Sequence, residues 1–371
     1  MFNGSYIWSL VIKGGYMKKV DYLLLIAIII ISLFGLLMIY SSSYVWAEYK
    51  FNDPYKFLKS QAIFLIVGYV IMIIVANIPY IKYLNKANII FGVCFLLLIL
   101  VLIPGIGTIR NGSRSWFGIG SLGIQPSEFT KLALIIFTSK YLAHNEKLLK
   151  DIKKGVFPIL GILLLVFGLI MLQPDFGTGV VIVMTIIVLL FVSGVKMGFF
   201  VKIGILGLIG VVILVIMAPY RLKRILSFIN PWTDPLGSGF QIIQSLYSIG
   251  PGGLLGLGFG NSIQKHFYLP EPQTDFIFSI ISEEFGFVGI LIVASLFITI
   301  IYRGFKIAIN SEDKFGKFLA FGITFGLSFQ ALLNLMVVVG LIPVTGYTLW
   351  LYTKLQSNFA LKIKGFARFD M

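Results

Sequence analysis

The chain has 371 residues, of which 58% are hydrophobic and only 12% are charged, and its mean hydropathy is +0.96. Soluble domains carry about twice that share of charged residues, so water is excluded as the main solvent of this protein. The net charge of +15 is compatible with nucleic-acid binding. However, the basic residues lie mainly in short connections between apolar runs and form no single stripe, so no nucleic acid is expected as a partner.

Apolar runs dominate the chain. A bilayer core about 30 Å thick is crossed by roughly 20 helical residues, and eight runs are long enough to do so: 22–40, 62–78, 87–103, 155–172, 176–195, 203–220, 285–302 and 318–352. A more polar stretch, 128–142, predicts one further helix. The sequence therefore predicts an all-α, polytopic transmembrane bundle of about nine helices.

The distribution of Lys and Arg predicts how the bundle is oriented. Cytoplasmic loops are rich in these residues, and this holds best when the N-terminus lies inside. Two long loops, about 104–127 and 221–274, then lie outside, the larger one before the eighth helix. Within the larger loop, residues 240–248 predict a short amphipathic helix on the surface. We expect a cytoplasmic segment at 1–21, a membrane domain at 22–353 and a polar tail at 354–371.

Several common kinds of site are missing from the sequence. Cys94 is the only cysteine, and His144 and His266 are the only histidines, so neither an internal disulfide nor a Cys/His metal site is expected. The glycines at 250–260 do not form a GxGxxG motif after a strand, which argues against a nucleotide or other organic cofactor.

Acidic residues near membrane depth are costly and often functional. Asp275 opens a helix on the outer side beside aromatic residues, where it suits either proton abstraction or helix capping. Glu283 and Glu284 follow two turns later, as a buried hydrogen-bonding network or as groups that act directly. Glu128 and Lys131 are three residues apart, the spacing of an ion pair within one helix.

Two motifs start with Gln-Pro and continue to an acid, Gln125-Pro126 before Glu128 and Gln173-Pro174 before Asp175. Pro is favoured in the first turn of a helix and an acid there complements the helix dipole, so both motifs predict helix starts.

The outer loops are basic, against the usual trend. An anionic lipid diphosphate or ordinary lipid headgroups would each explain their cations, which are Arg110, Arg114, Arg221, Lys223, Arg224 and Lys265.

Five segments in order resemble the motifs of the shape, elongation, division and sporulation (SEDS) family, which includes RodA, FtsW and SpoVE. They are NGSRSWF at 111–117, QPSEFTK at 125–131, QPDFGT at 173–178, LPEPQTDFIF at 269–278 and GLIPVTG at 340–346. The resemblance implies a ten-helix peptidoglycan glycosyltransferase of the bacterial cytoplasmic membrane. Lipid II would be its substrate, a class B penicillin-binding protein its partner, and membrane lipids its surroundings.

By this resemblance Asp275 takes the place of the essential acid, and Glu128 and Lys131 the places of a functional acid–base pair. The basic residue often found directly before the family's Trp is Ser115 here, with Arg114 one position earlier. We assign Asp275 to catalysis and a further set to substrate binding, namely Arg114, Trp116, Glu128, Lys131, Lys265, Gln273, Thr274 and Glu283.

The chain departs from the family pattern after Thr348, where a tenth apolar helix would follow. It continues instead into a polar tail with Lys362, Lys364 and Arg368. A frameshifted or truncated gene end is the simplest account, and residues 356–371 are not expected to cross a bilayer.

The implied reaction joins two lipid-linked disaccharides, with Asp275 as general base for the acceptor hydroxyl. Basic side chains, alone or with a divalent cation such as Mg²⁺, would offset the charge on the departing diphosphate, although the sequence shows no dedicated metal cage. Two rival functions fit the same residues. A transporter that flips lipid II would also use intramembrane acids and broken helices, and a non-catalytic scaffold of a cell-wall complex would retain the fold.

Overall fold

The computed structural model describes residues 20–110, 113–118, 123–217, 219–270 and 272–343. The N-terminal segment, the end of the last motif and the tail at 354–371 lie outside these residues. Within the described part, seven helices are long and apolar enough to cross a membrane. The shorter apolar α7 and the more polar α5 bring the long helices to nine, as predicted.

The long helices are α2 (Tyr22–Phe51), α3 (Lys56–Asn77), α4 (Ile81–Leu100), α5 (Pro126–His144), α6 (Phe157–Met171), α7 (Phe176–Val192), α8 (Met197–Ile216), α11 (Ile277–Asn310) and α12 (Lys314–Val338). Shorter elements connect them: a hairpin of β1 (Thr108–Arg110) and β2 (Ser113–Trp116), the turns η1 (Glu146–Lys150), η2 (Ile152–Val156) and η3 (Pro231–Thr233), and the helices α9 (Pro219–Ile229) and α10 (Phe240–Ile249).

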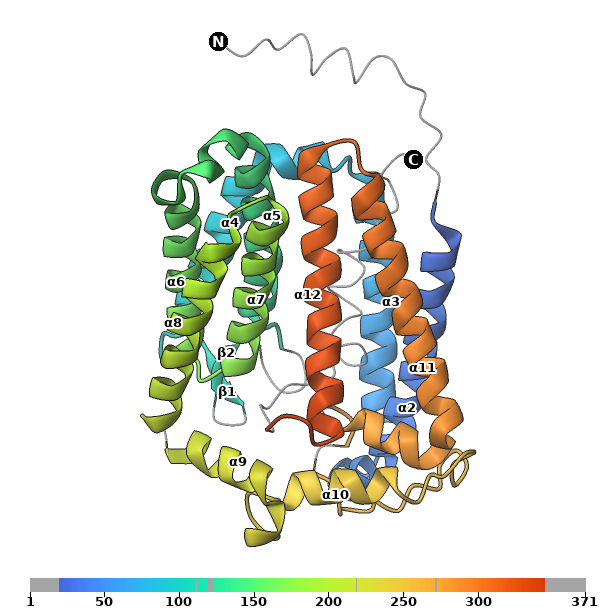
Figure 1. Cartoon of the computed structure of the whole chain (residues 1–371). Helices are drawn as coiled ribbons and strands as arrows, with labels where there is room; N and C mark the ends of the chain where they lie inside the picture. Colours follow the sequence, from blue (N-terminus) through green and yellow to red (C-terminus); the bar gives the residue numbers. More distant parts are fainter. Residues whose placement is uncertain (1–19, 111–112, 119–122, 218, 271, 344–371) are drawn as a thin grey trace.

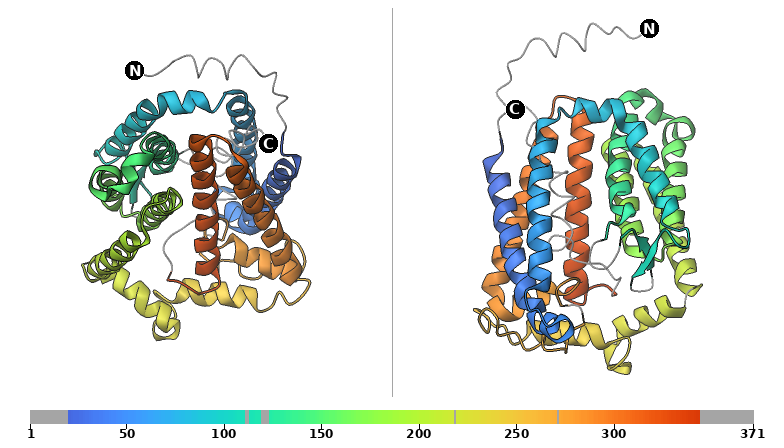
Figure 2. Two further views of the ribbon diagram at one scale, coloured as in Figure 1. Left: turned by 45° about the horizontal axis from the view of Figure 1, so that its top comes forward. Right: turned by 180° about the vertical axis from the view of Figure 1, so that it is seen from behind.

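The long helices stand side by side, and the two loops predicted to lie outside share one end of the bundle (Figures 1 and 2). The β-hairpin lies within the bundle near that end, and α9 and α10 lie across the end. The predicted surface helix at 240–248 is thus α10. Because both long loops meet at one end, the alternation inferred from the basic residues agrees with the fold.

Helix α12 stands between two hydrophobic cores. One core contains buried residues of α2, α10, α11 and the second half of α12, such as Leu327 and Ala331. The other contains buried residues of α4 to α8 and the first half of α12, such as Phe315 and Ile323. Since α12 contributes one half of its length to each core, its position sets how the two sides of the bundle dock.

Both predicted helix starts are confirmed. Pro126 occupies the first turn of α5, and the carboxylate of Asp175 caps α7 by accepting a hydrogen bond from the Thr178 N–H at 3.1 Å. The side-chain amide of Gln125 donates to the same carboxylate at 2.8 Å. The two Gln-Pro motifs therefore also bond to each other.

Two helices extend furthest beyond their predicted ends. α2 continues past residue 40 through three buried serines, because Ser42 and Ser43 donate to the carbonyl of Ile39 in their own helix. α11 starts at Ile277, eight residues before its predicted apolar run, because loop groups satisfy its buried glutamates. In both cases, partners in the fold made polar residues compatible with a helix.

The backbone of α11 breaks at Gly286, where φ is 60° and ψ is −154°. The carbonyls of Glu283 and Glu284 accept N–H groups of the glycine-rich loop 252–258 at 2.9 and 3.0 Å. The N–H groups of residues 287 and 288 donate to carbonyls of the same loop at 2.9 and 3.1 Å. The glycine cluster is therefore the segment that pairs with a broken helix.

Gly256 is where this pairing is tightest. A Cβ atom on Gly256 would lie 2.2 Å from the carbonyl oxygen of Glu284, and the residue has a φ of +80°. Gly260 in the same loop has a similar φ of +82°, but a Cβ there would meet nothing within 4 Å. The two glycines share the backbone requirement and differ only in the contact.

We expect Gly256→Ala to lower the melting temperature of the detergent-purified protein more than Gly260→Ala does. Both substitutions incur the strain of a positive φ, about 1 kcal/mol or more. Only Gly256→Ala forces the loop away from α11. Thermal unfolding and limited proteolysis of the loop would measure this, and equal behaviour of the two variants would contradict the close-contact explanation.

Candidate active site

The buried ion pair of α5 is the first component of the site. The Lys131 ammonium lies 2.6 Å from the Glu128 carboxylate, and both side chains are 1% exposed. Lys131 also donates to the side-chain carbonyl of Gln330 on α12 at 2.8 Å. The predicted pairing is therefore confirmed, and it sits at an interface between helices.

Asp275 lies directly before α11 and is half-buried. Its backbone carbonyl accepts a hydrogen bond from the Asn334 amide of α12 at 3.0 Å, and Asn334 is 0% exposed. The N-cap of α11 is Phe276, with no side-chain cap hydrogen bond. Proton abstraction and helix capping by Asp275 therefore both stay predictions.

The start of α11 is also held from the side of α10. The Ser245 hydroxyl lies 2.7 Å from the Ser279 hydroxyl and donates to the Val338 carbonyl at 2.7 Å. All three groups are buried. The surface helix, the first turn of α11 and the end of α12 are thereby fixed to one another near Asp275.

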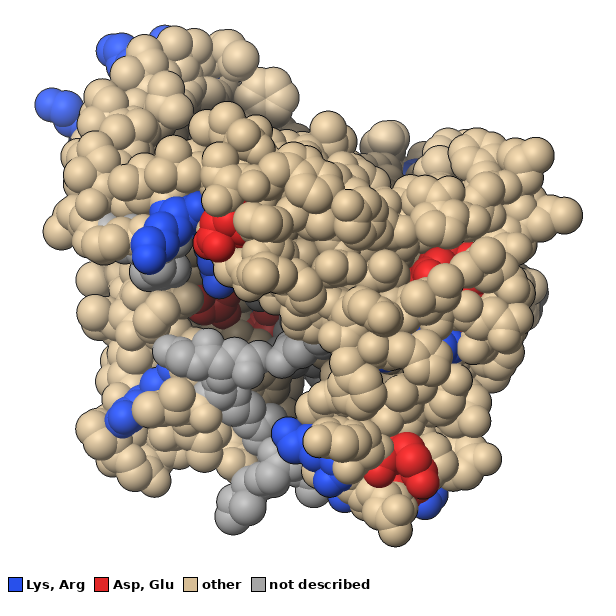
Figure 3. All heavy atoms as spheres, turned by 90° about the horizontal axis from the view of Figure 1, so that it is seen from below, with Lys and Arg blue, Asp and Glu red and all other residues tan. Residues whose placement is uncertain are grey.

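The outer end of the bundle is mostly uncharged. In Figure 3, which views this end, acidic and basic atoms gather around a recess near the centre of the face, with acidic atoms visible at its floor. A recess that opens at the membrane surface and contains charged groups suits a substrate that carries a charged head on a lipid tail.

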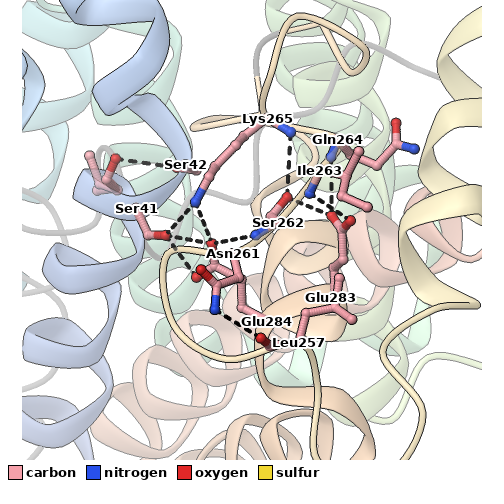
Figure 4. Close-up of polar contacts among 11 residues, drawn as sticks. Ser41, Ser42, Leu257, Asn261, Ser262, Ile263, Gln264, Lys265, Glu283 and Glu284 are labelled. Carbon is pink, nitrogen blue, oxygen red and sulfur yellow. Dashed lines mark hydrogen bonds and ion pairs between the residues drawn. The ribbon is translucent and has the colours of Figure 1, made fainter.

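A second buried ion pair lies at the break in α11 (Figure 4). The Lys265 ammonium is 2.9 Å from Glu284, and both side chains are 0% exposed. The Ser41 hydroxyl of α2 lies 2.6 and 2.7 Å from the two carboxylate oxygens of Glu284. The Lys265 ammonium also lies 4.8 Å above the ring of Tyr44. Lys265, which the sequence placed on the basic outer surface, is therefore an internal partner in this structure.

Glu283 also bonds to the larger outer loop. Its carboxylate accepts the Ser262 hydroxyl at 2.5 Å and the N–H groups of Ile263 and Gln264 at 2.9 and 3.4 Å. Of the two readings of Glu283 and Glu284, the buried hydrogen-bonding network is the one that the geometry displays.

The remaining predicted site residues lie on loops of the outer end. Arg114 and Trp116 are on β2 and are half-buried, and Ser113 anchors that hairpin by donating to the carbonyl of Gln173. In the motif that ends at Asp275, Gln273 is buried and Thr274 is half-buried. No group of three or more His, Cys, Asp or Glu residues in the described ranges could hold a metal ion.

Comparison with known proteins adds an independent line of evidence. The family model of FtsW, RodA and SpoVE, described as a cell cycle protein, matches residues 21–354. Stage V sporulation protein E of Bacillus subtilis is 52% identical over 329 residues, which are 89% of this chain and 90% of that protein. The chain belongs to the SEDS family. The probable peptidoglycan glycosyltransferase FtsW of Geobacter sp. (strain M18) is 39% identical over the same shares of the two chains.

Solved structures agree with the SEDS assignment. A chain of a peptidoglycan synthase complex that coordinates polymerization and crosslinking superposes with a TM-score of 0.74 at 29% identity, covering 94% of this chain and 96% of that one. The rod shape determining protein RodA of Thermus thermophilus gives 0.68 at 26% identity, over 95% and 96%.

Sequence reasoning missed three polar residues of this SEDS chain. Gln330 and Asn334 lie four residues apart in an apolar run, a spacing that puts two amides on one helix face. Ser41 begins a run of three serines within the first helix. Each is unusual at membrane depth, and this signal was available in the sequence, but their partners were not.

We expect Glu128→Ala and Lys131→Ala each to destabilise the protein by about 3–5 kcal/mol, because either change leaves a buried charge without its counter-ion. The double variant Glu128→Gln/Lys131→Met should regain much of the stability. Chemical unfolding in detergent would measure it. Glu146→Gln, in the exposed pair with Lys314, is the control and should change little. Unaltered stability in both single variants would contradict the assignment.

Variants of Lys265 test whether this residue only stabilises the structure or also binds the substrate. Lys265→Met should destabilise by about 3–5 kcal/mol, because Glu284 then stays buried without a cation. Adding Glu284→Gln should restore both stability and turnover if Lys265 is only an internal partner. A double variant that is stable but inactive would show instead that Lys265 acts on the substrate.

Proposed function

We propose that the chain polymerises lipid II into glycan strands at the outer face of the bacterial cytoplasmic membrane, as a multi-pass peptidoglycan glycosyltransferase. One observation carries this proposal. A half-buried acid, Asp275, lies at the outer end of the bundle and is linked through one turn of α12 to the buried pair Glu128–Lys131. Relatives of this fold named as probable peptidoglycan glycosyltransferases support it.

Asp275 is the general base of the proposed reaction. Its carboxylate takes the proton of the acceptor sugar hydroxyl, whose oxygen attacks the anomeric carbon of the donor. A new glycosidic bond forms as the bond from that carbon to the undecaprenyl diphosphate breaks, and the diphosphate leaves with the electron pair. Both substrates are lipid-linked, which is why the acid lies at the mouth of a membrane bundle.

The departing diphosphate requires positive charge. Arg114 on β2 and Lys131 of α5 are the cations that we assign to it. Lys265 is left out, because its ammonium bonds to Glu284 at the break in α11, whereas Lys131 is linked to Asp275 through Gln330 and Asn334 of α12. The described residues form no cage of acidic ligands, so no step is derived through a metal, and a divalent cation bound with the substrate remains a prediction.

A buried amide atom supports substrate binding near these groups. The side-chain oxygen of Gln273 has no hydrogen-bond partner within the described part of the chain. Buried polar atoms are seldom left in that state. We assign this atom to a hydrogen bond with the bound sugar or diphosphate, together with contacts from Trp116 and Thr274.

A class B penicillin-binding protein is the proposed partner. The support is the match along almost the whole chain to a component of a peptidoglycan synthase complex. The identity of 52% to a stage V sporulation protein, against 39% to an FtsW protein, favours a role in sporulation.

We expect Asp275→Asn to lower polymerisation by about 10² to 10⁴-fold while the protein still folds, because the amide keeps the size and removes the basic oxygen. The measurement is polymer formed from lipid II by purified protein in detergent, where no two leaflets exist. Asp234→Asn is a matched control, since Asp234 is an exposed acid of the same outer loop that accepts hydrogen bonds from Ser238.

Full turnover by Asp275→Asn would end the general-base assignment. Absence of polymer from the wild-type protein, with lipid II translocation in vesicles, would instead favour the transporter. If the wild type did neither, the scaffold would be favoured.

A further inference from the structure

Two amide side chains of α12 contact the two parts of the site, the buried ion pair of α5 and the acid before α11. Gln330 and Asn334 are one helical turn apart, so their side chains leave the same face of the helix. Gln330 accepts from the Lys131 ammonium of α5 at 2.8 Å, and Asn334 donates to the Asp275 carbonyl before α11 at 3.0 Å. Segments 144 residues apart in the chain (131 and 275) are therefore held by one turn of one helix.

The hydrogen bond from Asn334 reaches a part of the backbone that no helix orders. Asp275 precedes the first turn of α11, whose N-cap residue, Phe276, makes no side-chain cap hydrogen bond. The position of the Asp275 carboxyl depends on where its backbone lies. A buried amide bonded to its carbonyl fixes that position from a rigid element.

The hydrogen bond that Gln330 accepts from Lys131 orients an ammonium that already has a counter-ion. Glu128 and Lys131 lie on the same helix and can move together, whereas Gln330 ties Lys131 to α12. An amide oxygen adds no charge to the site, so its contribution is to orient the Lys131 ammonium. Together the two amides set the separation of the cation from the acid.

We propose that Gln330 and Asn334 are positioning residues, which hold Lys131 and Asp275 at a fixed separation through one turn of α12. The proposal rests on the proposed function, in which these two groups act on the same pair of lipid-linked sugars. Misplacing a reacting group by about 1 Å can cost roughly 100-fold in rate. Asn334 and Gln330 thus act on turnover without touching the reacting atoms.

The test compares Asn334→Leu and Gln330→Met with Thr324→Val. Each substitution keeps approximate size and removes hydrogen bonding from a buried residue of α12. Thr324 bonds only within its own helix among the described residues, to the Ala320 carbonyl, so it reports the general effect of such a loss. Initial rates of lipid II polymerisation over a range of concentrations give kcat and KM, and thermal unfolding and size-exclusion give the folded fraction.

We expect Asn334→Leu and Gln330→Met to lower kcat per folded protein by about 10- to 100-fold, with KM within about threefold of the wild type. Their melting temperatures should resemble that of Thr324→Val, which keeps its kcat. Wild-type kcat in the two amide variants, or a loss explained by the unfolded fraction alone, would overturn the proposal. If either variant does not fold, Asn334→Ala or Gln330→Ala is judged by the same readouts.

Wild-type and Asp275→Asn proteins in the same assay distinguish a failure of the proposed function from a failure of the positioning role. An inactive wild type, or an active Asp275→Asn variant, would count against the proposed function. An active wild type and an inactive Asp275→Asn variant, together with fully active Asn334→Leu and Gln330→Met, would count against the positioning role alone.

Discussion

The constraint on which this structure depends is that lipid offers no hydrogen-bond partners. Every polar group at membrane depth must therefore find its partner inside the protein. The buried Glu128–Lys131 pair shows the consequence most clearly, because its charges are compensated within α5 and Lys131 also donates to Gln330 of α12. A need for polar partners thus joins two helices that apolar packing alone would not hold in one register.

The same constraint explains the break in α11. Interrupting a helix frees backbone carbonyls and N–H groups, and here the glycine-rich loop 252–258 pairs with them. Glu283 and Glu284 then bond to the residues that follow in the loop, which leads on to Asp275. The same contacts therefore order the outer loop and help to place the proposed catalytic acid.

Apolar packing sets how close the helices come, and polar contacts set their register. A Cβ on Gly304 of α11 would lie 2.5 Å from the Thr324 hydroxyl of α12, so the two helices approach closely. Small residues allow such approach in membranes, where the lipid is as apolar as the side chains it would replace. Apolar packing does not fix the register of the helices, whereas the directional hydrogen bonds of Asn334 and Gln330 do.

The sequence by itself determined what depends on neighbours in the chain. Eight apolar runs and one more polar stretch predicted the nine long helices, Pro126 and Asp175 predicted helix starts, and the spacing of Glu128 and Lys131 predicted their ion pair. Five ordered motifs pointed to the SEDS family, and the family model confirmed it.

Only the tertiary structure decided which distant residues compensate each buried polar group. Glu284 is paired with Lys265 and with Ser41, 243 positions away, and Asp275 is fixed by Asn334, 59 positions away. These contacts place Lys265 in the interior beside Glu284 and give the partners of two amides that the sequence left unnoticed. The physical reason is that a residue's polarity determines the cost of burying it, whereas only the packing of distant helices determines which group offsets that cost.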